Sequence, residues 1–110
     1  MAHPFVSHFG DLVIDLAQYR VLLGQQPLFL TYREYALLVY LATHAGHVVT
    51  KRRLMEEGLG RHDPGSLRMV DEQIRHLKSK VERGNQPVIE EVRGVGYRFV
   101  REPSPQPAAG

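Results

Sequence analysis

Short apolar stretches separated by turn-forming residues fill the first third of the chain. Residues 9–15, 19–23 and 28–30 are rich in apolar side chains, and residues 24–27, Gly-Gln-Gln-Pro, have the composition of a turn. Closely spaced stretches of this kind are typical of antiparallel strands that are joined by tight turns. The local pattern therefore predicts an antiparallel meander of three strands.

The spacing of apolar residues changes to a helical period after Leu30. Thr31-Tyr-Arg-Glu34 matches a capping box, in which the Thr hydroxyl accepts a hydrogen bond from a first-turn amide and the Glu side chain accepts one from the cap residue. Gly46 is free to adopt the left-handed conformation that ends many helices. A helix is predicted between these two signals, with an apolar face made of Tyr35, Leu38, Ala42 and Ala45.

Two further helices are predicted, with a loop between them. Thr50 can cap a short helix that runs from Lys51 to about Glu57. Glycines and a proline then interrupt the chain, so residues 58–65 are expected to form an exposed loop. Residues 66–83 are the longest amphipathic segment, and their apolar stripe comprises Leu67, Val70, Ile74, Leu77 and Val81.

The end of the chain predicts a hairpin followed by a tail. Residues 88–100 have the pattern of two strands around a glycine-rich tip at 94–96. Residues 102–110 are dominated by proline and small residues and are expected to be disordered. Residues 1–5 are interpreted as a linker or a tag remnant, which leaves residues 6–101 as the folded domain.

The composition indicates one soluble domain. With 110 residues, 43% of them hydrophobic, the chain can bury one ordinary core. The absence of cysteine excludes disulfides and thiolate zinc sites, and it suits a reducing compartment. No apolar stretch approaches the roughly 20 residues that span a bilayer, and no signal peptide is visible. We therefore expect a soluble cytoplasmic protein with no membrane partner.

Basic residues are concentrated in the second half of the chain. The net charge is only +2, but residues 51–101 hold twelve of the 14 Lys and Arg residues against eight acidic residues, which is a net charge of +4. Residues 1–50 have a net charge of −1. This uneven distribution is the electrostatic pattern of a protein that binds nucleic acid with one part of its surface.

The polar face of the third predicted helix has two interpretations. A charged face is usually only a solvated surface. Here a short helix precedes it across a loop and a hairpin follows it, an order typical of a helix that enters a DNA groove. Glu72 would then accept a hydrogen bond from a cytosine amine or position a neighbouring side chain. Donors to phosphates or to guanine are available from Arg75, His76, Lys78 and Arg83.

Arg93 lies beside two glycines in the predicted hairpin tip. By itself this arrangement fits an ordinary turn arginine and a DNA contact equally well. Next to a helix in the major groove, however, the arginine is well placed for the negative potential of a narrow A·T-rich minor groove. The glycines would let the turn approach the DNA closely.

Catalysis and metal binding are not favoured by the sequence. His44 and His47 are separated by Gly46, and no third ligand is nearby, so we interpret them as surface histidines at a helix end. Glu90 and Glu91 are neighbours in a predicted strand, so their side chains point to opposite faces. They cannot act as a pair of catalytic carboxylates on either side of one substrate bond. No nucleophile elbow or nucleophilic cysteine is present. We expect no enzymatic activity, no cofactor and no bound metal.

Three separated motifs stand out in the chain: Leu30-Thr-Tyr-Arg-Glu34, Arg68-Met-Val-Asp71 with Ile74-Arg-His-Leu-Lys78, and Val92-Arg-Gly-Val-Gly-Tyr97. Together they resemble the signature of the OmpR/PhoB-type winged-helix effector domain of bacterial response regulators. The resemblance extends over about residues 6–100, with the motifs in the same order as in the family. It implies an α+β winged helix-turn-helix fold with an N-terminal antiparallel four-stranded sheet, three helices and a C-terminal β-hairpin wing. The first region would then contain four strands instead of three.

The resemblance also implies roles for individual residues. In the family, the positions that match Met69, Glu72 and His76 lie at or near base edges. Arg93 matches the wing arginine that enters the minor groove. Phosphate contacts are implied for Arg68, Gln73, Arg75, Lys78 and Tyr97.

Three departures from the family pattern affect these roles. Leu59 stands where the family often has a tryptophan, His76 replaces a frequent arginine, and Glu72 occupies a position that is often apolar. The target DNA sequence therefore cannot be taken from any relative.

Several partners are implied by the resemblance. Tandem direct-repeat sites in duplex DNA are expected, and the loop at 58–65 resembles a segment that contacts RNA polymerase. A receiver domain would precede this one in a response regulator, so we interpret the chain as an isolated effector half or as a stand-alone regulator. In isolation it is expected to be a monomer. The remaining alternative is a winged-helix module that binds protein or RNA in place of duplex DNA.

Overall fold

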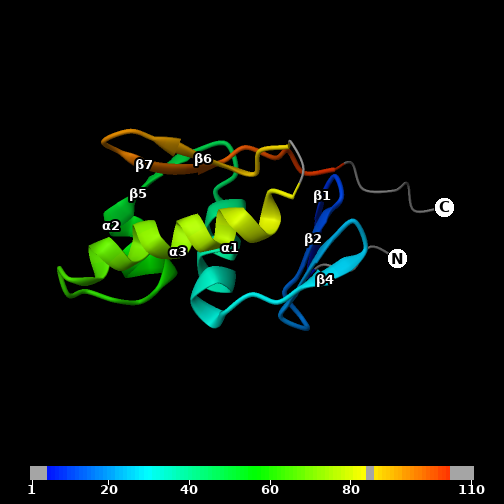
Figure 1. Ribbon diagram of the computed structural model, residues 1–110, viewed down its shortest axis with the longest axis horizontal. Helices are drawn as coiled ribbons and strands as arrows, with labels where there is room; N and C mark the ends of the chain where they lie inside the picture. Colours follow the sequence, from blue (N-terminus) through cyan, green and yellow to red (C-terminus); the bar gives the residue numbers. More distant parts are fainter. Residues whose placement is uncertain (1–4, 84–85, 105–110) are drawn as a thin grey trace.

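The computed structural model describes residues 5–83 and 86–104, which pack around one hydrophobic core (Figure 1). The strands are β1 (Val6–Phe9), β2 (Leu12–Asp15), β3 (Arg20–Leu23), β4 (Gln26–Leu28), β5 (Val48–Thr50), β6 (Ile89–Val92) and β7 (Gly96–Phe99). The helical elements are α1 (Tyr32–Thr43), α2 (Lys51–Arg53), the π-helical turn η1 (Leu54–Gly58) and α3 (Ser66–Val81). This is the winged-helix architecture that the resemblance implied.

The N-terminal sheet has four antiparallel strands in the order β1-β2-β3-β4. On β2, Leu12 and Ile14 are buried, and their cross-strand partners on β3 are buried as well. The local prediction of three strands was wrong, and the four strands implied by the resemblance are confirmed. Gly10, with a φ of +67°, lies in the tight turn between β1 and β2, so β1 is the missed strand and lies, apart from Phe9, before the predicted stretch 9–15.

A second tight turn changes the assignment of residues 24–27, all of which were predicted to be a turn. Gly24 and Gln25 have φ values of +57° and +69°, and two consecutive residues with positive φ match the twist of a hairpin. Gln26 and Pro27 are therefore part of β4. Proline is tolerated there because β4 is an edge strand of the sheet.

Helix α1 begins at the predicted capping box. The Thr31 hydroxyl accepts a hydrogen bond from the Glu34 amide at 3.2 Å, and Glu34 Oε1 accepts one from the Thr31 amide at 2.9 Å. The helix ends at Thr43, slightly before the predicted end, and Gly46 has a φ of +85° beyond it. Its buried apolar side chains are Leu37, Leu38 and Leu41, of which only Leu38 belonged to the predicted stripe.

Residues 48–50 form β5, a strand that the sequence did not predict. β5 pairs with β7, which comes much later in the chain. A strand of this length has no periodic signal of its own, so only its distant partner defines it. The predicted cap of α2 is confirmed, because the Thr50 hydroxyl accepts a hydrogen bond from the Arg53 amide at 3.1 Å.

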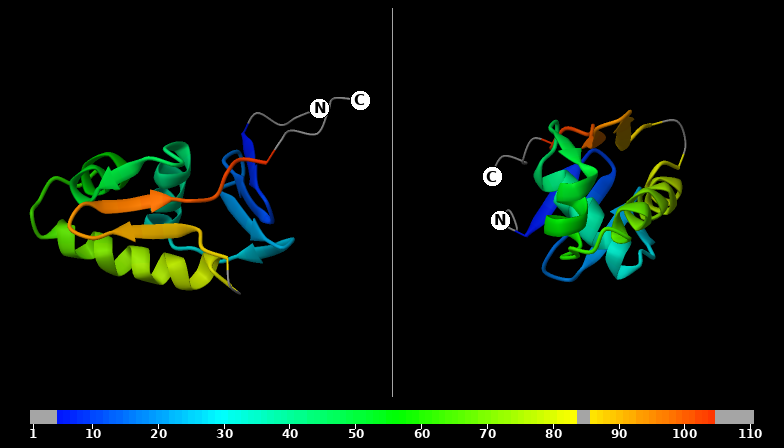
Figure 2. Two further views of the ribbon diagram at one scale, coloured as in Figure 1. Left: turned by 90° about the horizontal axis from the view of Figure 1, so that it is seen from above. Right: turned by 90° about the vertical axis from the view of Figure 1, so that its left-hand side faces the viewer.

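Helix α3 packs its predicted apolar stripe into the core. Val70, Ile74, Leu77 and Val81 are buried, and Leu67 is partly buried. The second sheet has the order β5-β7-β6. Seen from above, the β6–β7 hairpin runs alongside α3, with its tip toward the N-terminal end of the helix (Figure 2). The hairpin is the predicted wing.

Gly96 at the start of β7 is required by packing. A Cβ atom there would lie 1.9 Å from the carbonyl oxygen of Val49 on β5, so β5 and β7 approach too closely for any other residue. Gly94 serves the turn itself, in which it has a φ of +77°. The turn conformation therefore requires Gly94, and the close packing of β5 and β7 requires Gly96.

The segment after β7 returns to the N-terminal sheet. The Ser104 amide donates to the carbonyl oxygen of His8 at 2.7 Å, and the Ser104 hydroxyl accepts from the Gly10 amide at 2.7 Å. The start of the tail for which we expected disorder is thus attached to β1. Residues 105–110 of that tail and residues 1–4 of the expected linker lie outside the described residues.

Candidate nucleic-acid interface

The exposed face of α3 carries polar side chains that have no partner within the described part of the chain. Arg68, Glu72, Arg75 and His76 are all exposed, and none of these side chains forms a hydrogen bond or an ion pair with another described residue. The donors of both guanidinium groups are therefore available to a ligand. The face combines cationic groups suited to phosphates with groups that suit base edges.

The predicted contact residues of α3 follow a regular order around this face. At about 100° per residue, Glu72 lies at its centre, with Met69 and Gln73 on one flank and Lys78 on the other. Met69 and Gln73 are half-buried against the body of the domain, and Lys78 is partly exposed. All seven predicted α3 residues lie outside the buried apolar stripe and spread over somewhat more than half of the helix circumference, the remaining three being Arg68, Arg75 and His76.

Lys78 lies near an acidic residue that stabilises the start of the wing. Its ammonium is 3.9 Å from Glu82 Oε1. The other carboxylate oxygen of Glu82 accepts hydrogen bonds from the amides of Val88 and Ile89, at 2.7 and 2.9 Å. Glu82 therefore joins the end of α3 to β6, and Lys78 is only loosely held beside it.

Tyr97 differs most from the role that the resemblance implied. The side chain is only 5% exposed, and its hydroxyl donates to Asp71 Oδ1 at 2.7 Å. Burial, and then the hydrogen bond to Asp71, raise the pKa of this hydroxyl. A hydroxyl has a single proton, and here that proton is donated to Asp71 instead of being free for a phosphate.

Lys51 is a further candidate contact residue, which the sequence pattern did not predict. Its ammonium donates to Asp71 Oδ2 at 3.1 Å, so Asp71 joins the first residue of α2 to α3 and β7. The only local signal for Lys51 was its position directly after the Thr50 cap. That signal says nothing of its partner, which lies on another helix.

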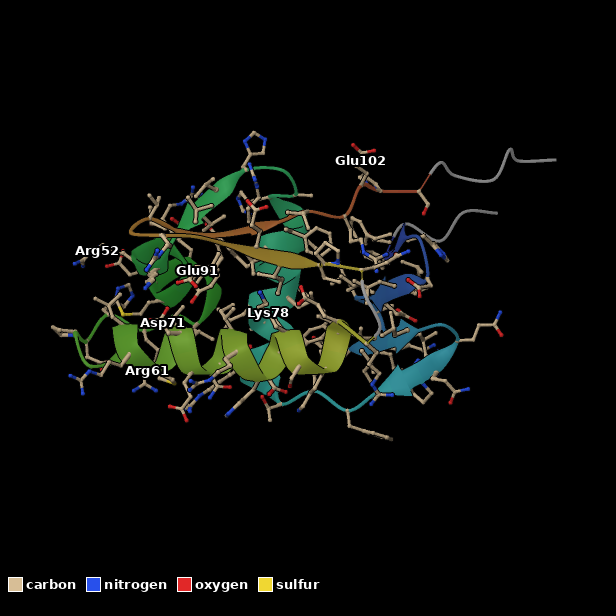
Figure 3. The ribbon with its side chains drawn as sticks, turned by 45° about the horizontal axis from the view of Figure 1, so that its top comes forward. Arg52, Arg61, Asp71, Lys78, Glu91 and Glu102 are labelled. Atoms are coloured by element: carbon tan, nitrogen blue, oxygen red, sulfur yellow. The ribbon has the colours of Figure 1, made fainter. Side chains whose placement is uncertain are left out.

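A groove separates α3 from the β6–β7 hairpin. Its volume is about 550 Å³, and Tyr97 lies on its wall. Figure 3 shows Asp71 and Lys78 on the side of α3 that faces the hairpin and Glu91 on the hairpin above them. The groove carries three cationic and three acidic side chains, namely Lys51, Arg75, Lys78, Asp71, Glu82 and Glu91.

The wing tip presents Arg93 to solvent. Arg93 is exposed, and within residues 5–83 and 86–104 its guanidinium has no hydrogen-bond or ion-pair partner. The turn is closed by a hydrogen bond from the Val95 amide to the Val92 carbonyl at 2.9 Å. Val95 is 47% exposed, so the tip offers one apolar and one cationic side chain.

The loop between η1 and α3 is ordered by its own side chains. The Asp63 carboxylate accepts from the Ser66 hydroxyl at 2.8 Å and from Arg61 Nε at 3.3 Å. The Ser66 hydrogen bond is the main reason that the pKa of Asp63 lies below its ordinary value. Gly58, which was predicted to begin the loop, is the last residue of η1.

The histidine and glutamate pairs considered in the sequence have structural explanations. The His44 and Tyr40 rings stack with their centroids 4.4 Å apart, and His44 Nδ1 is 2.9 Å from the Tyr40 carbonyl oxygen. Glu90 pairs with Arg98 on the face of the hairpin opposite to Glu91. The described residues contain no cluster of three or more potential metal ligands. Among the described helices, none has the length and apolar character to cross a membrane.

Comparisons with known proteins agree with this geometry. The family model described as transcriptional regulatory protein, C terminal, matches residues 25–99. The transcriptional regulatory protein SrrA of Staphylococcus aureus is 36% identical over 106 residues, which are 94% of this chain and 44% of SrrA. The chain thus spans less than half the length of this relative.

Two solved structures are similar over most of the chain. The response regulator DrrB of Thermotoga maritima, an OmpR/PhoB homologue, has 37% identity and a TM-score of 0.78 over 87% of this chain and 44% of DrrB. The DNA-binding domain of RstA from Klebsiella pneumoniae, solved in complex with the RstA box, has 33% identity and a TM-score of 0.78 over 89% of this chain and 98% of that domain. This chain belongs to the transcriptional regulatory protein C-terminal family, that is, to the OmpR/PhoB-type winged-helix DNA-binding domains.

Proposed function

We propose that this domain binds specific sequences of duplex DNA and regulates transcription as the effector domain of a two-component response regulator. The observation that carries the proposal is the unpartnered polar face of α3 beside an unpartnered arginine at the wing tip. The RstA domain that this chain resembles was solved in complex with the RstA box. A cytoplasmic location is part of the proposal.

In this proposal α3 lies in the major groove. Met69, Glu72 and His76 contact base edges, where glutamate can accept from a cytosine amine and histidine can donate to guanine. Phosphates on either side of the groove are bound by Arg68, Gln73, Arg75 and Lys78. Tyr97 acts indirectly, because its hydroxyl holds Asp71 and thereby positions α3 against the wing.

Arg93 enters the neighbouring minor groove. The hairpin runs alongside α3, so its tip approaches the duplex from the same side as the helix (Figure 2). An arginine without an internal partner loses no ion pair when it enters a narrow A·T-rich minor groove. Val95 beside it adds an apolar contact.

RNA and protein are the competing ligands. The major groove of A-form RNA is deep and narrow and does not admit side chains, which disfavours duplex RNA as the ligand of α3. A protein ligand is disfavoured by the composition of the α3 face, which is charged throughout its centre, whereas the cores of protein interfaces are depleted of charge.

Further partners follow from the family. A receiver domain precedes the effector domain, tandem direct repeats form the DNA site, and the isolated domain is a monomer. The ordered loop at residues 59–65, with Arg61 and His62 exposed, contacts RNA polymerase. Leu59, which stands in place of a frequent tryptophan, is partly buried against the core and leaves these exposed residues as the contact surface.

Selection of bound duplexes from a random pool tests the proposal. We expect one enriched sequence, whose affinity falls with salt with a log–log slope of about −0.9 per neutralised phosphate. An RNA duplex of the same sequence should bind far more weakly. Failure to enrich any sequence, or an affinity that does not depend on salt, would contradict the proposal.

A further inference from the structure

Neighbouring major and minor grooves of a duplex are separated by one sugar–phosphate backbone. A domain with α3 in the major groove and Arg93 in the adjacent minor groove therefore has this backbone between α3 and the β6–β7 hairpin. The groove of about 550 Å³ lies at this position. If the proposed function holds, on which this inference rests, a backbone phosphate meets the charged side chains of this groove.

Each lysine of the groove lies near an acidic side chain of the domain itself, Lys51 closely and Lys78 more loosely. The Lys51 ammonium lies 3.1 Å from the Asp71 carboxylate, and the Lys78 ammonium lies 3.9 Å from Glu82. Both acidic side chains also have structural contacts. Asp71 accepts from the Tyr97 hydroxyl, and Glu82 accepts from backbone amides at the start of β6.

Glu91 is the third acidic side chain of the groove, and it has no such contact. It is exposed, and in the described part of the chain its carboxylate has no hydrogen-bond or ion-pair partner. It lies directly opposite Tyr97 across the β6–β7 ladder, so both side chains are on the face of the hairpin toward α3. Figure 3 places Glu91 above Asp71 and Lys78.

We propose that Glu91 is an affinity-limiting residue, whose carboxylate repels the DNA backbone in the groove between α3 and the wing. The repulsion acts on a phosphate and is therefore the same for every base sequence. It lowers the affinity for all duplexes without changing the preference among them. Stable occupancy then requires the favourable contacts of α3 and Arg93 with a matching site.

The test compares Glu91→Gln with Glu90→Gln. Both substitutions remove one negative charge from β6 and keep the size of the side chain. Glu90 lies on the opposite face of the hairpin, where it pairs with Arg98. Binding is measured by fluorescence anisotropy on a duplex selected with the wild-type domain and on a duplex with the same bases in scrambled order.

We expect Glu91→Gln to raise the affinity for both duplexes by roughly 3- to 30-fold at low salt, with the ratio between the duplexes unchanged. The gain should shrink at high salt, because exposed charges are then screened. Glu90→Gln should change either affinity by less than about twofold, since its carboxylate faces away from the backbone. Thermal unfolding checks that both variants fold.

Three outcomes overturn the inference. Glu91→Gln could leave the affinity unchanged or lower it, both substitutions could raise it equally, or the gain could be limited to one of the two duplexes. All three leave the proposed function intact, provided that the wild-type domain binds its selected duplex. If the wild-type domain binds no duplex at all, that result contradicts both the proposed function and this inference.

Discussion

The Lys80 ammonium on α3 donates a hydrogen bond to the carboxylate of Glu34 on α1, with 2.6 Å between Nζ and Oε1. The Glu34 side chain is only 3% exposed, and the same oxygen accepts from the Thr31 amide. Lys80 also donates to the Phe29 carbonyl at 3.1 Å. The capping box that starts α1 therefore also holds the last turn of α3.

Replacing Lys80 with methionine should destabilise the domain. Lys80→Met leaves the buried Glu34 carboxylate without its charged partner, and we expect the free energy of unfolding in urea at neutral pH to fall by about 1 to 3 kcal/mol. Lys78→Met is the matched control on the same helix. Lys78 lies at the surface, 3.9 Å from Glu82, so its loss should cost less than about 0.5 kcal/mol. If both variants lost the same unfolding free energy, the buried Lys80–Glu34 contact would stabilise the domain no more than the surface pair of Lys78 and Glu82.

The same contact predicts a pH dependence of stability. Burial by itself raises the pKa of Glu34, but the hydrogen bonds from Lys80 and Thr31 together hold that pKa below its ordinary value of 4.5. The folded state therefore binds the proton less tightly than the unfolded chain. The contribution to stability is present above pH 4.5 and is lost as the pH falls through the folded-state pKa.

Urea unfolding of the wild-type domain and of Glu34→Gln measures this effect. The wild-type domain should be the more stable at neutral pH, and the difference should shrink as the pH falls well below 4.5. Titration of other carboxylates affects both proteins alike and cancels in the difference. A difference that stays constant over this range would be inconsistent with a lowered pKa of Glu34.

Tyr97→Phe tests whether the hydroxyl positions Asp71 or contacts DNA. We expect stability to fall by about 1 to 2 kcal/mol, because a hydrogen bond to a carboxylate is lost. The salt slope of DNA binding should not change, since no phosphate contact is removed. If the slope instead falls by about one, Tyr97 contacts a phosphate as the family resemblance implied.

Arg93→Ala tests the wing. The substitution should weaken binding to sites with an A·T-rich flank by about 1 to 3 kcal/mol and should affect G·C-rich flanks less. Arg98→Ala is the control, because Arg98 pairs with Glu90 on the opposite face of the hairpin from Glu91. Binding is measured on duplexes that differ only in the flank. An equal loss on both flanks would indicate a plain phosphate contact.

His76→Ala and Lys78→Ala separate the two kinds of contact on α3. Selection from a random pool with His76→Ala should return a different preferred base, because the substitution removes the proposed base contact. Lys78→Ala should weaken binding to all sequences alike and lower the salt slope by about one. If both variants merely reduce affinity uniformly, α3 does not lie in the major groove as proposed.

Local signals in the sequence predicted those elements whose causes are local. The capping box at Thr31 and the cap at Thr50 each involve atoms within three residues of each other. The apolar stripe of α3 was predicted with its buried residues, because a helical period specifies one face of a helix. Strand β1, which the turn at Gly10 joins to β2, and the pairing of β5 were missed. A tight turn and a short strand are defined by cross-strand partners and carry little periodic signal.

The sequence by itself determined where the helices begin, which face of α3 is polar, and that the wing tip carries an arginine, because these properties follow from backbone geometry and residue order. Only the tertiary structure decided which polar groups meet. The Tyr97 hydroxyl is held by Asp71 instead of being free, Lys51 joins the groove, and Glu91 faces α3 on the hairpin. Lys51, Asp71 and Tyr97 lie on three different elements, and only the packing of α3 against α2 and β7 brings their side chains within hydrogen-bonding distance.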